Sequence, residues 1–474
     1  MLCVLAVALW SKRMASISHV LACALLVVVV LDPWAVLWPG FWLSFAAVAV
    51  LVYAGGGHAH AHQHGERWLM AGALLTAAGR AQYAVTLGLV PLSMLLFAQV
   101  SLVSPLANAI AIPLISLVVT PLALLGSVLP GAFAAGPLLA AHALVAWLAQ
   151  TLAWCAALPW AVWSAPTPSF ALFCWAMWGT LWLLAPRGWP VRWLGLAGWL
   201  PLLAAEPTHP PAGALRVTAF DVGQGMALLI ETAQHRLLYD TGPAYGPDAN
   251  AGARVLLPYL RARGIGRLDM LVLSHSDMDH SGGARAVLDA LPVTLLQSSL
   301  PAGHPLRRAA RRHLPCIAGQ HWEWDGVQFE FLHPAADSYA DPSLKPNARG
   351  CTLKVTARGG SMLLAADIEA AQERSLVQQY GSQLRADVLL APHHGSKTSS
   401  TVEFLQAVAP RHAVFQLGYR NRYHHPHALV WARYAGRTIA CWRTDQNGAI
   451  TLDFGQQLHI SGYRQQQARY WYGR

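Results

Sequence analysis

Charged residues are scarce in this 474-residue chain. Only 12% of its residues are Asp, Glu, Lys or Arg, and 55% are hydrophobic, whereas a typical soluble domain has about 25% charged residues. The shortage is uneven, because residues 1–211 contain only six of the 33 Lys and Arg residues and three of the 23 acids. This composition argues against a single soluble domain. It predicts a lipid-facing part followed by a water-facing part.

Two local signals are also missing. None of the seven cysteines forms a CxxC pair, so we expect neither a disulfide framework nor a zinc finger. The apolar residues 1–10 have no basic region before them, which argues against a cleavable signal peptide. This segment is better interpreted as the end of a helix that begins upstream, and the chain is expected to be a fragment or a short form.

Long apolar runs fill the first part of the chain. Most are close to the length, about 17–25 residues, that a helix needs to cross a bilayer, and Trp residues flank several of them, as in interfacial aromatic belts. We therefore predict a polytopic α-helical membrane domain over residues 1–205. The expected spans are Ile17–Trp38, Phe41–Gly56, Trp68–Val100, Leu102–Leu129, Ala134–Trp160, Ser169–Leu184 and Val191–Ala205.

Prolines and an amide interrupt the span Leu102–Leu129, which contains Asn108 and Pro113. Backbone groups freed by such breaks are tolerated in a membrane where they face protein or a water-filled path. Two interpretations therefore stay open for Asn108 and Pro113, a role in lining a channel and an ordinary helix kink.

Basic residues in the loops indicate an orientation, because excess positive charge marks the cytoplasmic side. If each expected span crosses once, one side carries Lys12, Arg13, Arg67, Arg187 and Arg192. The second part of the chain would then lie outside the cytoplasmic membrane. If Val191–Ala205 does not cross, the second part would lie on the cytoplasmic side instead. The His-rich run His58–His64 is interpreted as a polar loop rather than a metal scavenger.

Residues 206–213 form a Pro-rich linker, after which the pattern changes. Short apolar strands such as Leu268–Leu273 alternate with short helices such as Thr401–Val408. Mixed elements at this density predict a layered α/β domain over residues 214–474.

The most specific pattern is SHSDMDHSGG at Ser274–Gly283. Four potential ligands occur within six positions, directly after an apolar strand and before two glycines. Metal sites need imidazoles and carboxylates that converge from a tight loop on a rigid strand end. A solvated loop has no need for this arrangement. The pattern therefore predicts a metal site at His275, Asp277, Asp279 and His280.

Polar side chains follow other strands as well. Asp240, Asp367 and the pair His393–His394 each come after an apolar segment. A single Asp after a strand is usually a turn residue, but several such positions in one domain favour one convergent site.

The ligand loop resembles that of the metallo-β-lactamase superfamily, His-x-His-x-Asp-His, with Asp277 in place of the second His. This variant is similar to the ComEC family of competence DNA-uptake channels, as are three other segments of the second part, DVGQG at Asp221–Gly225, HHGS at His393–Ser396 and NRYHHP at Asn421–Pro426. In the first part, GFWLSF at 40–45 and SPLAN at 104–108 resemble the same family's competence domain.

The resemblance implies an αββα sandwich that carries a hydrolase site. The implied metal ligands are His275, Asp277, Asp279, His280, Asp367 and His393. The implied catalytic groups are Asp277, Asp279 and His394. His394 and His425 are second candidates for ligating metal or contacting phosphate. Residues expected to shape the pocket or support the ligands are Asp221, Gln224, Asp240, Asn347, Ser396 and His425. One or two divalent ions would bind, and the carboxylate of Asp277 moves the expectation from Zn²⁺ towards Mn²⁺.

The sequence departs from the family pattern at three points. The family's N-terminal extracytoplasmic module and first helices are absent, and Met226 stands where many members have Asp. Between residues 283 and 367 there is no clear counterpart of the superfamily's third-motif His, for which His333 is the nearest candidate.

The implied function is DNA internalisation at the inner membrane. A channel would pass transforming single-stranded DNA, and a metal-dependent nuclease would degrade the other strand. Expected partners are single-stranded or duplex DNA, membrane lipids, other competence proteins and a second copy of the chain. Candidate DNA contacts are the Arg clusters Arg261–Arg267, Arg307–Arg312 and Tyr419–Tyr423, the last of which interleaves Tyr with Arg as single-strand binders do.

Two alternatives stay open. One is a membrane-anchored metallohydrolase that acts on a lactone, a thioester or RNA, because substrate choice depends on pocket details. The other is a transporter whose hydrolase domain is vestigial and non-enzymatic.

Overall fold

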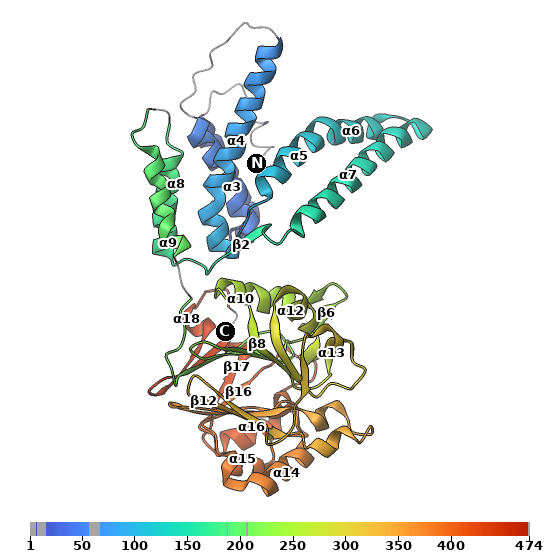
Figure 1. Ribbon diagram of the computed structural model, residues 1–474, viewed down its shortest axis with the longest axis vertical. Helices are drawn as coiled ribbons and strands as arrows, with labels where there is room; N and C mark the ends of the chain where they lie inside the picture. The colour runs from blue at the N-terminus through green and yellow to red at the C-terminus, as the bar shows by residue number, and fades with distance from the viewer. Residues whose placement is uncertain (1–5, 7–15, 56–66, 187, 205–206, 473–474) are drawn as a thin grey trace. The chain divides into compact units, whose positions relative to one another are not determined.

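The computed structural model describes residues 6, 16–55, 67–186, 188–204 and 207–472 (Figure 1). The chain divides into two compact units, Met1–Pro207 with Arg261–Gly264, and Thr208–Leu260 with Ile265–Arg474. The predicted run His58–His64 and the predicted loop cations Lys12, Arg13 and Arg187 lie outside the described residues.

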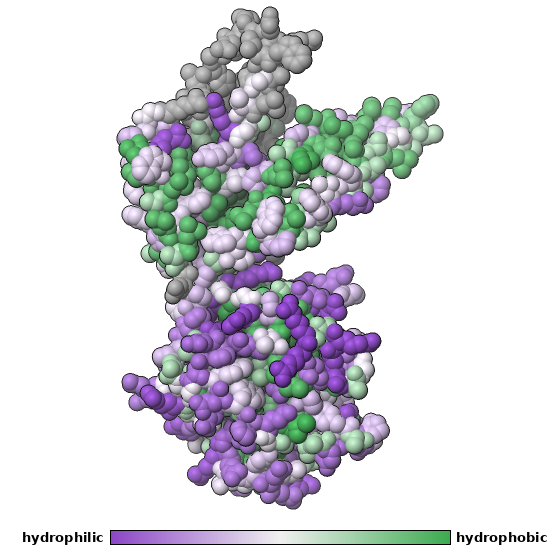
Figure 2. Space-filling view, in the orientation of Figure 1, coloured by the Kyte–Doolittle hydropathy of each residue, from purple (hydrophilic) through white to green (hydrophobic). Residues whose placement is uncertain are grey.

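Apolar helices make up the first unit, as the sequence predicts. Among the described residues, three helices are long and apolar enough to cross a membrane, Thr76–Phe97, Ser104–Val128 and Gly131–Ala156. Figure 2 shows a largely hydrophobic surface over α6 (Thr120–Val128) and α7 (Ala135–Ala156). The other apolar helices are α2 (Ile17–Leu31), α3 (Pro39–Gly55) and α8 (Phe170–Leu183), and α4 spans Arg67–Phe97.

The span with the prolines is helical but irregular. Helix α5 (Ser104–Leu114) continues through a π-helical turn, η2 (Ile115–Val119), into α6. Pro113 lies just before this turn, and π-helical turns are frequent at functional sites. The amide of Asn108 donates a hydrogen bond to Ser104 Oγ at 3.2 Å. A role for Asn108 and Pro113 in lining a channel stays a prediction.

The expected span Val191–Ala205 is not a continuous α-helix. It contains the 3-10 helix η4 (Arg192–Trp199) and a single turn, α9 (Leu200–Leu203). Segment η4 packs closely on α8, since a Cβ added at Gly195 would lie 2.3 Å from the carbonyl oxygen of Gly179. Among the described helices it is not one of membrane-crossing length, so the side of the membrane inferred from seven crossings stays a prediction.

Two β-sheets form the centre of the second unit. In spatial order, the eight-stranded sheet contains β10 (His313–Pro315), β9 (Val293–Ser298), β8 (Leu268–Leu273), β5 (Arg236–Tyr239), β4 (Leu228–Glu231), β3 (Leu215–Ala219), β18 (Ile450–Phe454) and β19 (Leu458–Gly462). The seven-stranded sheet contains β11 (His321–Trp324), β12 (Val327–His333), β13 (Thr352–Ala357), β14 (Gly360–Leu364), β15 (Val388–Leu390), β16 (His412–Phe415) and β17 (Ala440–Arg443).

Helices cover the outer face of each sheet, which confirms the predicted αββα layers (Figure 1). The inner faces share one apolar core that includes Val217, Tyr239, Phe329 and Phe454. A second core lies under the helices α10 (Leu257–Ala262), α12 (Ala284–Ala290) and α13 (Pro305–Ala309). A third lies under α14 (Ala370–Tyr380), α15 (Val402–Val408) and α16 (Ala428–Ala435).

One disulfide bond corrects the expectation drawn from the cysteines. Cys316 and Cys351 are bonded across 35 residues and are both fully buried. Cys351 lies against the ligand loop, because its amide donates to the carbonyl of Ser274 at 3.0 Å. The sequence contains no local spacing that pairs these two cysteines, since the β-sandwich alone brings them together.

The disulfide yields a stability prediction. We expect Cys316→Ser to lower the free energy of unfolding of this unit by about 2–4 kcal/mol, because the cross-link restricts the unfolded chain. Thermal unfolding of the full chain, with and without reductant, measures the effect. The free energy of unfolding of the double variant Cys316→Ser/Cys351→Ser should be no lower than that of the single variant. Reductant should not lower it further.

The control is Cys441→Ser, which removes a free, half-buried cysteine from the same unit. It should keep the wild-type response to reductant. A wild-type chain that unfolds at the same temperature in both conditions would contradict the prediction.

Candidate metal centre

The ligand loop joins β8 to a short helix, α11 (Met278–Ser281). It turns sharply after α11, and both glycines there are required by close backbone contacts. A Cβ at Gly282 would lie 2.2 Å from the amide nitrogen of Ala244, and one at Gly283 would lie 2.4 Å from the carbonyl of Thr241. The Gly-Gly pair therefore lets the loop fold back on the strand ends and directs its side chains to one point.

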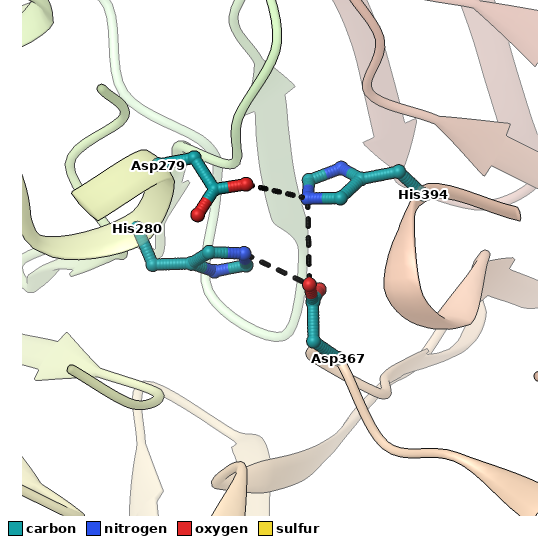
Figure 3. A group of neighbouring side chains, drawn as sticks. All are labelled: Asp279, His280, Asp367 and His394. Atoms are coloured by element: carbon teal, nitrogen blue, oxygen red, sulfur yellow. Dashed lines mark ion pairs between the residues drawn. The ribbon is translucent and has the colours of Figure 1, made fainter. Parts of the chain in front are cut away.

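Four side chains of this domain converge (Figure 3). Their ligand atoms all lie within 4.8 Å of one another, and the four residues are Asp279, His280, Asp367 and His394. His280 Nε2 is 3.3 Å from Asp367 Oδ1, and His394 Nε2 is 3.6 Å from Asp367 Oδ2. His394 Nε2 is also 3.5 Å from Asp279 Oδ2. We call these four residues the metal-site cluster.

The two sheets contribute to the cluster separately. Asp279 and His280 follow β8 of the eight-stranded sheet, whereas Asp367 and His394 follow β14 and β15 of the other. His394 lies in the turn η9 (Pro392–Gly395), where it and His393 both have positive φ, near 50°. Such strained backbone is concentrated at functional sites. The cluster therefore forms only where the ends of the two sheets meet.

A buried carboxylate orients the ligand loop from behind. Asp240 follows β5 and accepts a hydrogen bond from His280 Nδ1 at 2.8 Å. It also accepts from the amide and the hydroxyl of Ser274, both at 2.7 Å. The same hydroxyl oxygen lies 2.9 Å from Nδ1 of His275. Because the Ser274 proton points to Asp240, this oxygen is free to accept from His275.

The third imidazole is fixed in the same way. His394 Nδ1 lies 2.8 Å from the carbonyl oxygen of Gln416, which can only accept. All three rings thus bear their Nδ1 proton on a hydrogen bond and leave Nε2 available. Among the described residues, the buried Nε2 atoms of His275, His280 and His394 and the Oδ1 atom of Asp367 make no well-directed hydrogen bond, although His280 Nε2 and Asp367 Oδ1 lie 3.3 Å apart.

This donor set fits a divalent metal. Buried polar atoms are nearly always hydrogen-bonded, so several such atoms without hydrogen bonds around one point fit the ligand set of a metal ion. Metal-bound His usually donates its other ring nitrogen to a carboxylate or a carbonyl, as His280 and His394 do here. Imidazole and carboxylate together suit several divalent transition metals.

Charge coupling in the cluster is strong. Burial disfavours the charged form of Asp367, but His280 and His394 outweigh it and hold its pKa well below the usual range. Burial likewise opposes the charged form of His280, yet Asp367 and Asp240 raise its pKa well above the usual value. Asp367 and Asp279 similarly raise the pKa of buried His394. A bound cation would take the place of protons on these rings, so metal binding releases protons.

The other predicted ligands lie beside the cluster. His275 Nε2 is 3.6 Å from Asp277 Oδ2, and its ring centroid is 4.1 Å from that of His280. His393 Nε2 is 3.7 Å from Asp367 Oδ2 at the partly exposed edge of the site. The metal-site cluster thus contains His394 and not His393, and the assignment of His275, Asp277 and His393 as ligands stays a prediction.

Some of the residues predicted around the pocket lie near the metal-site cluster, and the others contact loops outside it. Asn347 and His425 lie near the cluster, because Asn347 Nδ2 is 3.4 Å from His393 Nε2 and the His425 ring stacks on His394 at 6.5 Å. Burial and the neighbouring His394 lower the pKa of His425 to about 4. Ser396 contacts Thr398 through its hydroxyl, at 3.2 Å.

The DVGQG segment contacts other loops. Asp221 forms an ion pair with Arg464 at 2.8 Å, and Gln224 Oε1 accepts from the amide of Gly418 at 3.3 Å. Gly225 lies against the ligand loop, since a Cβ there would be 2.4 Å from the carbonyl of Asp279. This segment therefore supports the site from outside the metal-site cluster.

Three further residues have roles that the sequence did not reveal. His333 is not part of the metal-site cluster, because its Nδ1 lies 2.9 Å from the carbonyl oxygen of Gly350. Gln416 fixes His394 through its carbonyl, and a backbone acceptor leaves no signal in a sequence. Asn421 clamps its own loop by bonding both the amide and the carbonyl of His425, at 2.9 and 2.8 Å. The NRYHHP motif was the only available hint for Asn421.

Known proteins match both parts of the chain. Residues 1–190 match the family profile described as Competence protein, and residues 220–419 match that of the Metallo-beta-lactamase superfamily. Competence protein ComA of Neisseria gonorrhoeae is 40% identical over 91% of this chain and 58% of its own length.

Two other relatives match a shorter segment. Recombination protein 2 of Haemophilus influenzae is 35% identical over 55% of this chain and 31% of its own length. ComE operon protein 3 of Bacillus subtilis is 33% identical over 51% of this chain and 33% of its own length. The chain thus spans 58% or less of the length of these relatives.

Asp240 provides a test of the ligand geometry. In Asp240→Asn, one oxygen still accepts from Ser274, but the new amide cannot accept the Nδ1 proton of His280. The favoured tautomer then places the proton on Nε2, where it blocks ligation. We expect Mn²⁺ and Zn²⁺ affinity to fall about 10- to 100-fold, measured by metal titration of the full chain.

The matched control is Asp289→Asn, which changes an exposed carboxylate that pairs with Arg285. It should bind metal like the wild type. Equal metal affinity in Asp240→Asn and the wild type would show that Asp240 does not set the tautomer.

Proposed function

We propose that the chain, whose two parts match the Competence protein and Metallo-beta-lactamase superfamily profiles, belongs to a ComEC-type protein. In this proposal it takes DNA across the inner membrane and hydrolyses DNA at the metal-site cluster. The relatives named as competence proteins support the uptake role. In this proposal the apolar helices, with Asn108 and Pro113, line the path of one strand. The hydrolase domain degrades the strand that is not transported.

The observation that carries the nuclease proposal is the set of buried Nε2 atoms around Asp367 that make no hydrogen bond to another described residue. A vestigial domain would have no reason to keep three buried imidazoles oriented by Asp240, Ser274 and Gln416. Superfamily membership implies a divalent metal, and phosphodiester hydrolysis is a reaction that bound metals serve well.

We assign roles to the ligands as follows. Asp279, His280 and His394 would hold one ion, with Asp367 as the carboxylate shared with a second position next to His275 and Asp277. Bound divalent ions supply an activated water and stabilise charge on phosphate oxygens. The carboxylate of Asp277 makes the second position oxygen-rich, which favours Mn²⁺ over Zn²⁺.

The remaining polar groups bind and orient substrate in this proposal. Asn347 Nδ2 lies 3.4 Å from His393 Nε2 at the partly exposed edge, where the same amide group can also donate to a phosphate oxygen. His393 Nδ1 is 3.3 Å from the hydroxyl of Thr398 and 3.5 Å from Glu369, so its ring is held in place. The buried side of the cluster excludes bulk water, because His275 and His280 have no exposed surface.

The nuclease proposal has a direct test. The full chain in detergent should cleave single-stranded or duplex DNA only with added Mn²⁺ or Zn²⁺. Asp279→Ala should reduce cleavage to the level seen with a chelator, because it removes a ligand carboxylate. Gel electrophoresis of end-labelled DNA, together with metal analysis of each protein, measures both properties.

Asp289→Ala is the control, since Asp289 on α12 is exposed and pairs with Arg285. It should cleave like the wild type. Bound metal without DNA cleavage would move the proposal to another substrate, such as a lactone, a thioester or RNA. Absence of bound metal would leave transport as the function.

We further propose that the hydrolase domain lies outside the cytoplasm. The Cys316–Cys351 bond supports this side. Structural disulfides persist in oxidising compartments and are rare in the cytosol. Membrane lipids would surround the helices, and assembly with other competence proteins or with a second copy stays a prediction.

Labelling in cells tests this orientation. In a chain whose five other cysteines are replaced by Ser, the disulfide is kept and Arg374→Cys is added on the exposed face of α14. A membrane-impermeant maleimide should label this position in intact spheroplasts. A matched Lys12→Cys chain should be labelled only after permeabilisation. The reverse pattern would place the hydrolase domain in the cytoplasm.

A further inference from the structure

A row of stacked rings leads away from the metal-site cluster. The ring of His425 stacks on the ligand His394, with centroids 6.5 Å apart and planes 15° apart. Tyr423 in turn stacks on His425, with centroids 5.7 Å apart and planes 25° apart. Tyr423 is 51% exposed. The row therefore connects a buried ligand to the surface within three rings.

A surface hollow continues from the same loop. The hollow has a volume of about 1540 Å³, and its lining includes Tyr419, Arg464, Arg469, Tyr470, Trp471 and Tyr472. Small-ligand pockets measure about 300–1,000 Å³, so this hollow is large enough for several units of a polymer. Tyr419 belongs both to the hollow and to the loop that carries Tyr423.

The aromatic rings of this surface are paired with arginines. Arg420 lies 5.1 Å from the centre of the Tyr419 ring, Arg422 lies 4.9 Å from that of Tyr423, and Arg469 lies 5.2 Å from that of Trp471. Within the described part of the chain, none of these three arginines forms an ion pair with a carboxylate. The acid in the hollow, Asp445, is already paired with Arg443 at 2.7 Å. The positive charges of these three arginines are thus available to bind an anionic partner.

We propose that the rings His425, Tyr423, Tyr419 and Tyr470, with Arg420, Arg422 and Arg469, form a binding track for single-stranded DNA that ends at the metal-site cluster. Exposed aromatic rings stack on bases, and arginines between them meet the phosphates. In a duplex the base faces are covered by their neighbours, so the rings would have nothing to stack on. The identity of the strand as DNA rests on the proposed function above.

The track is held in place by contacts that a loose surface loop would not need. Asn421 bonds both backbone groups of His425, which fixes the loop that carries Tyr423. The ion pair of Asp221 with Arg464 anchors the C-terminal segment at 2.8 Å. Tyr470 and Tyr419 nevertheless remain 91% and 68% exposed. Large rings fixed in position and left in water are suited to stacking on a ligand.

Binding can be measured without cleavage. The full chain in detergent, with chelator present, is titrated into a fluorescent oligothymidylate of about 16 nucleotides, a length that matches single-strand site sizes. Tyr423→Ala and Tyr470→Ala should each weaken binding about tenfold. Tyr423→Phe and Tyr470→Phe keep the rings and should bind like the wild type, which separates stacking from a folding defect.

The salt dependence tests the arginines. Each phosphate contact to a single strand contributes about 0.7 to the slope of log K against log salt. Arg422→Ala should lower the slope by about that amount. Arg374→Ala removes an exposed arginine from α14 and should leave both affinity and slope unchanged.

The results separate this proposal from the nuclease proposal. Weaker binding in the Ala variants but not in the Phe variants supports the track, even if the chain cleaves no DNA. Tyr variants that bind like the wild type, or an oligothymidylate that binds no better than the matching duplex, overturn the track. Either of these two binding results overturns the track even if the chain cleaves DNA in a metal-dependent way.

Discussion

The hydrogen bonds of Asp240 are the constraint on which the site depends. One buried carboxylate receives the Nδ1 proton of His280 and both donors of Ser274, and the Ser274 oxygen is then left to accept from His275. Two imidazoles are thereby fixed in the tautomer that exposes Nε2. Burial lowers the pKa of His280, but Asp367 and Asp240 outweigh it and raise this pKa, so a bound cation would replace a proton on that ring. The fold thus prepares a site whose charge is balanced by a cation rather than by protons.

The packing of the two sheets is the second requirement. Asp279 and His280 come from the end of one sheet, and Asp367 and His394 come from the other. Their separation is therefore set by the apolar core between the sheets. The disulfide from Cys316 to Cys351 reinforces this region, since Cys351 also bonds the first residue of the ligand loop. Metal binding and stability of the domain are expected to be coupled, as in other metallo-domains.

Much of the fold and the ligand loop could be predicted from the sequence, because both depend on local patterns. Apolar runs predicted the membrane helices, and strand–Gly-Gly spacing placed Asp279 and His280. The sequence could not predict which of His393 and His394 joins the cluster. Both residues have positive φ, and the conformation of the turn determines which ring points into the cluster. The bonded cysteines and the acceptor Gln416 were missed for a related reason, because only the tertiary fold brings such partners together.

The DVGQG segment connects the metal centre to the surface beyond it. Gly225 lies against the carbonyl of Asp279, Gln224 bonds the amide of Gly418, and Asp221 holds Arg464. One short segment therefore contacts the ligand loop, the loop of stacked rings and the C-terminal segment. A Cβ added at Gly225 would lie 2.4 Å from the carbonyl oxygen of Asp279, and one at Gly418 would lie 2.7 Å from the amide nitrogen of Gln224, so a displacement of Asp279 would press on this segment. Strand binding and metal binding would then influence each other, although the residues that contact the strand and those that hold the metal are different.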